Sequence, residues 1–326
     1  MDKVSVLVAV YNAATFLPKC LGSLLSQSHA DIQVICVDDC STDNSPAILD
    51  SYAAQDERVS VVHLASNHGQ AYARNAGLAV ANGQYVCMLD ADDWFSPDAL
   101  EEAVGVFRQH PLTDAVLFET ILEYGDRSER YAMPQFEALT GKEAFALSLT
   151  WKIHGLYMIR AELHKKIPYD TSYRTYSDDN TTRLHYLASR EVRRCHGEYH
   201  YLQHGSSVTH AISGKRFDYL GANESLKNEL VRLGVDQDLV AEYENQRWLN
   251  LVDVYMFYHC HAGKLRPDER RHGKAELRRA WHGIDRGALR SDIKRKFGYR
   301  PMPSWWMFRL QEWAYFSLRG LLGKNR

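Results

Sequence analysis

The chain has 326 residues, of which 45% are hydrophobic and 25% are charged, and these fractions exclude an intrinsically disordered protein. Its length is sufficient for one large domain or two domains of moderate size. The formal net charge of −2 conceals an asymmetry, because residues 264–326 carry 17 Lys and Arg against 6 Asp and Glu. We therefore expect an acidic body followed by a basic segment, of the kind that binds anionic lipid or nucleic acid.

The six cysteines are scattered, without a C-x-x-C pair and without the histidine spacing of a zinc site. This pattern favours reduced thiols in a cytoplasmic protein. The first residues do not read as a signal peptide, and no window has the length of an apolar membrane span. We therefore expect a cytoplasmic chain whose contact with a membrane, if it has one, is peripheral.

The first hundred residues alternate between runs typical of buried strands and segments with apolar residues at helical spacing. This alternation predicts an α/β fold, with a mostly parallel sheet that is covered by helices on both faces. The expected strands are residues 4–10, 32–37, 59–64 and 85–89, and the expected helices are residues 15–28, 45–54 and 71–81.

Polar residues follow each of the four expected strands. Because the carboxyl ends of parallel strands meet at one edge of a sheet, we expect these groups to line one binding site. Helix capping is the alternative explanation for one or two of the groups, but acidic pairs at two separate strand ends make it a poor explanation for all four. The groups are Tyr11-Asn12, Asp38-Asp39, Asn67 to Gln70 and Asp90 to Asp93.

Asp90 and Asp92 lie two residues apart at the end of the fourth expected strand. In an extended chain such side chains point the same way, about 6–7 Å apart, as in a divalent-cation or ribose site. Neither a G-x-G-x-x-G nor a Walker loop is present, so a carboxylate-bound Mn²⁺ or Mg²⁺ is the remaining way to hold phosphates. The alternative is an acidic turn before a helix that begins near residues 96–98. For Asp93 we expect such a cap or a supporting contact.

Four segments of the first 95 residues follow one another in the order Val4 to Asn12, Val37 to Asp43, Asn67-x-Gly69 with Ala73-Arg74-Asn75, and Leu89 to Asp93. Together they resemble the opening strand, the uracil-binding turn, the third signature and the D-x-D motif of the inverting family 2 glycosyltransferases, which have the GT-A fold. Two departures from the family pattern are Ala9, where the family usually has Pro, and Cys40, where it usually has Gly.

The resemblance implies a role for each residue of these motifs. Asp39, with Asp38 beside it, would contact uracil, Asp90 would contact the ribose, and Asp92 would ligate the metal. Arg74 would lie near the base and the acids, although a surface salt bridge is an equal alternative. The residues expected to bind the nucleotide-sugar are Val10, Tyr11, Asn12, Asp38, Asp39, Gly69, Arg74, Asp90, Ala91, Gln203, His204 and Ser207.

The acidic pair Asp178-Asp179 resembles the family motif that supplies the general base of the transfer. Asp179 is the first candidate and Asp178 the second, and an acidic pair that caps a helix is the alternative. Trp151 and His154 resemble acceptor-side residues, although structural roles are common for both residue types. Between residues 96 and 212 we expect a strand over 115–118, a strand followed by a Gly-Ser turn over 199–209, and helices over 140–149, 160–166 and after residue 180.

The chain after residue 215 is helical in pattern, with helices expected over 220–233 and 239–258 and a basic helix from Pro267. Residues 304–319 are rich in aromatic residues and flanked by Arg and Lys, but they are too polar to span a membrane. They suit a helix that lies in the headgroup layer, or equally a helix that packs on the protein or on a second copy of it.

Together these features predict a GT-A catalytic domain over residues 1–212, with a nucleotide-sugar half (1–95) and an acceptor half (96–212), and a helical region over 213–326. The predicted function is an inverting, metal-dependent hexosyltransferase that moves a sugar from a UDP-sugar to a carbohydrate or lipid-linked glycan in cell-surface polysaccharide synthesis. A catalytically silent subunit that binds sugar-nucleotide or glycan is the alternative. A homodimer is compatible with the sequence, and nucleic acid is not an expected partner.

Overall fold

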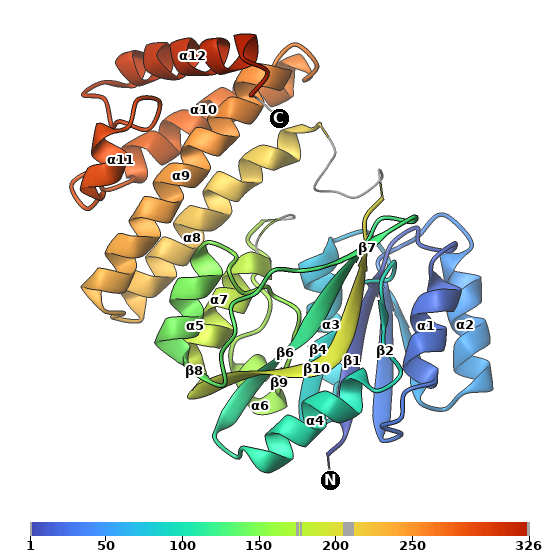
Figure 1. Ribbon diagram of the computed structural model, residues 1–326. Helices are drawn as coiled ribbons and strands as arrows, with labels where there is room; N and C mark the ends of the chain where they lie inside the picture. Colours follow the sequence, from blue (N-terminus) through green and yellow to red (C-terminus); the bar gives the residue numbers. More distant parts are fainter. Residues whose placement is uncertain (1, 174–175, 177, 205–211, 325–326) are drawn as a thin grey trace. The chain divides into compact units, whose positions relative to one another are not determined.

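The computed structural model describes residues 2–173, 176, 178–204 and 212–324 (Figure 1). The chain divides into two compact units, residues 1–207 and 208–326. The first unit contains a central sheet with helices around it, and the second is helical. Each unit has its own buried residues.

The sheet of the first unit has, within the described residues, the strand order β3-β2-β1-β4-β9-β6-β10-β5, with β7 beside β6 and β8 beside β10. The first four strands pair in parallel, whereas β9 runs antiparallel to both β4 and β6. The strands are β1 (Val4–Val10), β2 (Ile32–Asp38), β3 (Val59–His63), β4 (Tyr85–Met88), β5 (Trp94–Phe95), β6 (Thr113–Glu123), β7 (Ser128–Arg130), β8 (Leu139–Thr140), β9 (Tyr157–Arg160) and β10 (Glu191–Leu202).

Helices cover both faces of this sheet, as the unbroken apolar run of β1 predicts. Val6 and Val8 point into a core shared with α1 and α4, whereas Leu7 points to the other face, where α3 packs. Gly77 of α3 lets that helix approach closely, since a Cβ there would lie 3.3 Å from both Leu7 and Val37. The helices are α1 (Leu17–Leu25), α2 (Ser45–Gln55), α3 (Gln70–Val80), α4 (Ala99–Gln109), α5 (Gly141–Leu149), α6 (Ala161–Lys166) and α7 (Asp178–Ala188).

The sequence-based prediction was incomplete in the second half of the sheet. The expected strand that begins at Tyr199 is the end of β10, which runs from Glu191 to Leu202, and the Gly-Ser turn expected after it lies outside the described residues. The strand expected over 115–118 is part of the longer β6. Both strands are longer because they pair with each other along most of their length. The charged residues of β10 hid the strand pattern, because they pair with charges on neighbouring strands instead of facing the core. Strand β9 was not predicted, and Arg160 ends it instead of starting α6.

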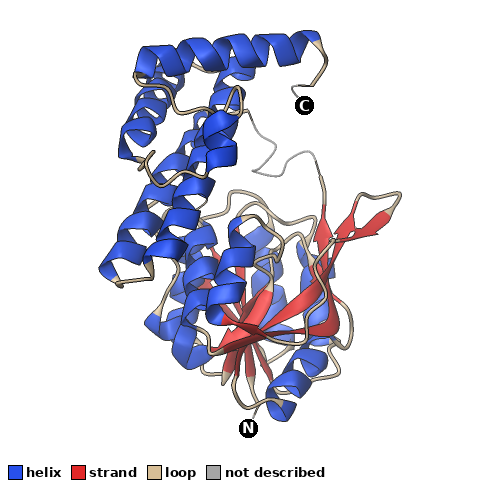
Figure 2. Ribbon diagram, turned by 60° about the vertical axis from the view of Figure 1, so that its left-hand side comes forward, coloured by secondary structure: helices blue, strands red, loops and turns tan. Residues whose placement is uncertain are grey.

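The second unit consists, in its described part, of helices (Figure 2). Buried aromatic residues on α9 and α12 form much of its core, with the Trp248 and Phe308 rings 5.5 Å apart. None of the described helices is long and apolar enough to cross a membrane. The elements are η2 (Gly214–Phe217), α8 (Asp218–Arg232), α9 (Gln237–His261), α10 (Pro267–Gly283), α11 (Ser291–Arg295) and α12 (Trp305–Leu321).

Candidate functional site

The loops that follow β1 and β2 are tied to each other. Asn12 adopts a left-handed conformation (φ 52°), and its Oδ1 accepts a hydrogen bond of 2.7 Å from the backbone N–H of Thr42. In return, the backbone N–H of Asn12 donates to Ser41 Oγ at 3.0 Å. Tyr11, beside this contact, keeps 52% of its surface exposed, and the C=O of Val10 accepts from Asp39 N–H. The predicted groups Tyr11-Asn12 and Asp38-Asp39 therefore form one preorganised surface.

The carboxylate of Asp39 holds the loop before α3. It accepts hydrogen bonds of 2.8 Å from the backbone N–H groups of His68 and Gly69 and from Asn67 Nδ2. Gly69 has a φ of 93°, a conformation in which a side chain would be strained. The neighbouring Asp38 accepts from His63 Nδ1 at 3.1 Å. Both acids are buried and organise the loops at the end of β2, and their contact with a base stays a prediction.

Arg74 links two of the predicted polar groups, Asn67 to Gln70 and Asp90 to Asp93, to the acidic pair Asp178-Asp179. Its guanidinium is buried, with Nη2 2.6 Å from Asp90 Oδ1 and Nη1 3.2 Å from Asp178 Oδ2. Gln70 Nε2 donates to the same oxygen of Asp90 at 2.9 Å. The ring of Tyr169 lies 5.3 Å from the guanidinium carbon. A surface salt bridge is therefore the wrong description of Arg74. We call these residues, Gln70, Arg74, Asp90, Tyr169 and Asp178, the Arg74 cluster.

The electrostatics of the Arg74 cluster follow from burial and pairing. Burial alone would lower the pKa of Arg74, but the carboxylates of Asp90 and Asp178 raise it above its usual value. Burial raises the pKa of Asp90, and the arginine opposes that effect. The side chains of Asp90 and Asp178 remain 26% and 35% exposed, so each carboxylate has surface left for a ligand.

The other two acids of the D-x-D segment have different partners. Asp92 Oδ2 lies 2.8 Å from His204 Nε2, and both side chains are partly exposed. Asp93 is buried and accepts from Leu202 N–H and from the Tyr199 hydroxyl, each at 2.8 Å. Burial, with the charges of neighbouring acids, raises the pKa of Asp93 to about 9. Asp93 therefore supports the end of β10, and it is not a helix cap, because α4 begins six residues later.

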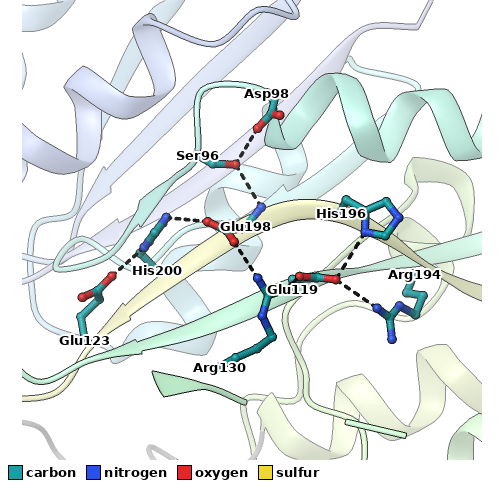
Figure 3. A network of polar contacts seen from close by, with 9 residues as sticks. All are labelled: Ser96, Asp98, Glu119, Glu123, Arg130, Arg194, His196, Glu198 and His200. Carbon is teal, nitrogen blue, oxygen red and sulfur yellow. Dashed lines mark hydrogen bonds and ion pairs between the residues drawn. The ribbon is translucent and has the colours of Figure 1, made fainter. Parts of the chain in front are cut away.

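Strand β10, which leads to Gln203 and His204, is held by a network of charged side chains (Figure 3). His200 lies between Glu123, 2.8 Å from its Nδ1, and Glu198, 3.5 Å from its Nε2, and its ring stacks on Trp94. The C=O of Glu123 also accepts from Gln203 N–H at 2.7 Å. Further pairs fix β10 against β6, β7 and the segment before α4, and their members are Ser96, Asp98, Glu119, Arg130, Arg194 and His196. Ser207 lies outside the described residues.

Trp151 and His154 lie between α5 and β9. Trp151 has a φ of 55°, its C=O accepts from the Tyr131 hydroxyl, and the Arg183 guanidinium lies 4.9 Å from its ring. His154 is buried, and its Nδ1 accepts from Leu156 N–H at 3.2 Å. Burial lowers the pKa of His154 to about 4, so the ring is neutral at pH 7. Of the two predicted acceptor residues, Trp151 is partly exposed and His154 is buried.

The described residues alone do not supply a complete set of ligands for a metal ion at this site. Within the part of the chain that the structure describes, no three His, Cys, Asp or Glu side chains are grouped to hold one. Asp92 is nevertheless a partly exposed carboxylate at the end of a strand. Mg²⁺ and Mn²⁺ accept one or two carboxylates when phosphate oxygens and water complete their coordination. The residues therefore fit a cation that binds together with a diphosphate.

Two tyrosines that the sequence did not reveal contribute to the site. The Tyr199 hydroxyl accepts from Asp90 N–H at 3.1 Å and donates to Asp93. The backbone N–H and C=O of Tyr169 each form a 2.8 Å hydrogen bond with the Asn75 side chain. Asn75 and Tyr169 are 94 residues apart, so no local pattern connects them. The only available signal was that Asn75 follows Arg74 in the third motif.

The chain is similar to known glycosyltransferases. A family model described as "Glycosyl transferase family 2" matches residues 5–179. Glycosyltransferase GlyG of Streptococcus pneumoniae is 40% identical over 100 residues, which are 31% of this chain and 33% of GlyG. TuaG of Bacillus subtilis, a glycosyltransferase named for teichuronic acid biosynthesis, is 46% identical over 99 residues, which are 30% of this chain and 39% of TuaG. The matched parts thus span well under half of these relatives.

A solved structure resembles the whole chain. The crystal structure of S. aureus TarS 1–349 in complex with UDP-GlcNAc superimposes with a TM-score of 0.75 at 19% identity, covering 99% of this chain and 92% of TarS 1–349. At this identity the likeness concerns the fold. The GT-A fold with a helical C-terminal region, which the sequence predicted, is confirmed.

Proposed function

Because the chain belongs to glycosyl transferase family 2, we propose that it transfers a hexose from a UDP-sugar to a carbohydrate hydroxyl, with inversion at the anomeric carbon. The observation that carries the proposal is the Arg74 cluster, in which one buried arginine joins Asp90 to Asp178. Similar proteins support the finer points. TarS was crystallised with UDP-GlcNAc, and the name of TuaG supports a role in cell-surface polysaccharide synthesis.

The donor would bind at the ends of β1, β2 and β4. In this proposal the exposed ring of Tyr11 and the loops held by Asn12 and Asp39 receive the base, and Asp90 hydrogen-bonds the ribose. Arg74 fixes the position of Asp90 and balances its charge. His204, which contacts Asp92, and Gln203 beside it in the chain follow the end of β10 and would complete the diphosphate side of the site.

The acidic pair at the start of α7 would perform the proton transfer. The acceptor oxygen attacks the anomeric carbon opposite the diphosphate, the bond from that carbon to UDP breaks, and UDP leaves with the electron pair. A carboxylate takes the proton of the acceptor hydroxyl. We assign this role to Asp179, because Asp178 accepts from Arg74 and from Asp179 N–H and is therefore a positioning residue. The N-terminus of α7 favours the negative charge of both acids.

A divalent cation, Mn²⁺ or Mg²⁺, would be held by Asp92, and when bound it would supply positive charge that stabilises the departing diphosphate. His204 would keep the Asp92 carboxylate oriented through their 2.8 Å contact.

The test is UDP release from a panel of UDP-sugars with and without Mn²⁺, together with UDP binding by calorimetry. We expect one donor to be hydrolysed in the presence of Mn²⁺. Asp179→Asn should lower turnover by about 10²–10⁴-fold and leave UDP binding unchanged, as expected for loss of a general base. Asp92→Asn should lower both turnover and UDP affinity. Asp126→Asn, at an exposed hairpin position, is the matched control.

Two results would contradict parts of the proposal. Equal UDP affinity in EDTA and in Mn²⁺ would rule out the metal role of Asp92. Tight UDP binding without release from any donor, with acceptor glycans present, would identify a catalytically silent subunit instead of an enzyme.

A further inference from the structure

The exposed face of α12 is apolar. Trp306, Leu310, Trp313 and Leu321 are 66%, 56%, 58% and 86% exposed, and their spacing places them on one stripe of the helix. The opposite side of the same helix is buried through residues such as Phe308. Large apolar residues that gather on an exposed face mark an interaction surface, whereas single exposed ones do not.

A groove beside this stripe combines apolar and basic side chains. Its volume is about 410 Å³, and it lies between α12 and the segment that follows α11. Phe297, in that segment, is 56% exposed. The residues that line the groove include Arg295, Phe297, Arg300, Met302, Trp306 and Leu310. Aromatic rings therefore lie next to two exposed arginines.

A second, smaller hollow lies between α10 and α12 and is more strongly basic. It has a volume of about 240 Å³ and is lined by Lys274, Ala275, Arg278, Trp305 and Arg309. None of the described residues that line either hollow is acidic. We call the stripe and the two hollows the α12 face.

The single acidic residue of α12 does not offset this charge. Glu312 is fully buried, and burial raises its pKa to about 8, so it is mostly neutral at pH 7. The α12 face therefore presents positive charge around an apolar centre.

We propose that the α12 face binds the surface of an anionic lipid bilayer. Tryptophan rings are favoured at the boundary between headgroups and acyl chains, and Leu310 and Leu321 can enter the apolar layer beneath. Arginine and lysine at the rim then lie at the level of the lipid phosphates. The inference concerns the second unit alone and does not depend on the proposed transferase activity.

Charge favours a membrane over the other occupants of such a face. In a symmetric dimer the α12 faces of the two copies would meet, and this would bring their arginine and lysine side chains close to each other. Nucleic acid would satisfy the arginines but would leave the apolar stripe in water. An anionic bilayer satisfies both at once, because it offers phosphate at its surface and hydrocarbon below.

The test is flotation of the full chain with vesicles of phosphatidylcholine alone and of phosphatidylcholine with phosphatidylglycerol. We expect binding to the anionic vesicles only. Trp306→Ser/Trp313→Ser should abolish that binding, while Val231→Ser/Leu233→Ser removes two exposed apolar residues of the α8 end and should not. Circular dichroism checks that each variant is folded.

A charge variant tests the same surface without touching its apolar centre. Arg278→Gln/Arg300→Gln, one residue from each hollow, should lower vesicle affinity by roughly thirtyfold at low salt. The matched control, Arg127→Gln/Lys166→Gln, removes two exposed charges from the first unit and should have a much smaller effect.

Three outcomes would overturn the proposal. These are no binding of the wild-type chain to anionic vesicles, unchanged binding of the tryptophan variant, and a concentration-dependent dimer in sedimentation velocity that the tryptophan variant abolishes. The last result would assign the α12 face to a second copy of the chain.

Discussion

The two units each contain a buried arginine with carboxylate partners, but the partners are exposed to different degrees. In the first unit Arg74 pairs with Asp90 and Asp178, which keep a quarter to a third of their side-chain surface. In the second unit Arg247, 3% exposed, pairs with Glu244, which is 2% exposed and also contacts Lys227.

This difference separates a site from a structural pair. The carboxylate of Glu244 is fully used inside the protein, because Asp285 N–H donates to it as well. The carboxylates around Arg74 have partners on one side and open surface on the other. We therefore expect changes at Arg74 to affect function more than stability, and changes at Arg247 to affect stability more than function.

The largest expected effect is that of Arg74→Met. Without the guanidinium, Asp90 and Asp178 repel each other and lose their fixed positions, so turnover should fall roughly thousandfold, which corresponds to about 4 kcal/mol. Because both acids reach solvent, the free energy of unfolding should fall by less than that. Donor turnover and urea unfolding measure the two quantities, and a folded variant with normal turnover would refute the role of Arg74.

The corresponding change in the second unit, Arg247→Met, should lower the free energy of unfolding by about 4 kcal/mol, because it leaves Glu244 buried with less compensation. UDP affinity of the folded protein should not change. Arg232→Met removes the exposed pair with Glu229 and is the control, with an unchanged urea midpoint expected. A small effect of Arg247→Met would mean that Lys227 alone compensates Glu244.

Glu312 is a buried acid for which the structure describes no cation partner, and Gln311 Nε2 donates to its Oε1. Its pKa is near 4.5 in the unfolded chain and about 8 in the folded chain. Between these values the unfolded state binds fewer protons, so stability should fall as the pH rises, by about 3 kcal/mol at pH 7 relative to pH 4.5. Glu312→Gln should flatten this dependence in urea unfolding, whereas Glu242→Gln, at a partly exposed ion pair, should not.

The smallest effect is expected for Tyr169→Leu, which removes the ring beside Arg74 and keeps the backbone contacts with Asn75. A cation–π contact of this kind contributes about 0.5–2 kcal/mol, so turnover should fall about fivefold with little change in KM. Tyr124→Leu removes an exposed ring beside Arg127 and serves as the control. An equal response of both variants would show that the Tyr169 ring does not support the cluster.

The first half of the sheet was predictable because its information is local. Val4 to Val10 forms β1 with the predicted bounds, and each polar group begins within four residues of the end of its strand. The second half depends on pairing between distant segments. Nothing near Glu191 indicates that β10 will lie beside β6, and the contacts of Arg74 with Asp178 and of Asp90 with Tyr199 each link residues roughly a hundred positions apart. The motif residues could thus be named from the sequence, whereas the tyrosines that contact them could not.

Cys40 offers a practical consequence of the loop geometry at the end of β2. It has a φ of 61° and is partly exposed, beside the loop that carries Tyr11 and Asn12. Cys260 is the other cysteine that is not buried. In a Cys260→Ser background, a thiol-reactive fluorophore would therefore attach mainly at Cys40, and its emission would report nucleotide entering the site without any substrate having to turn over.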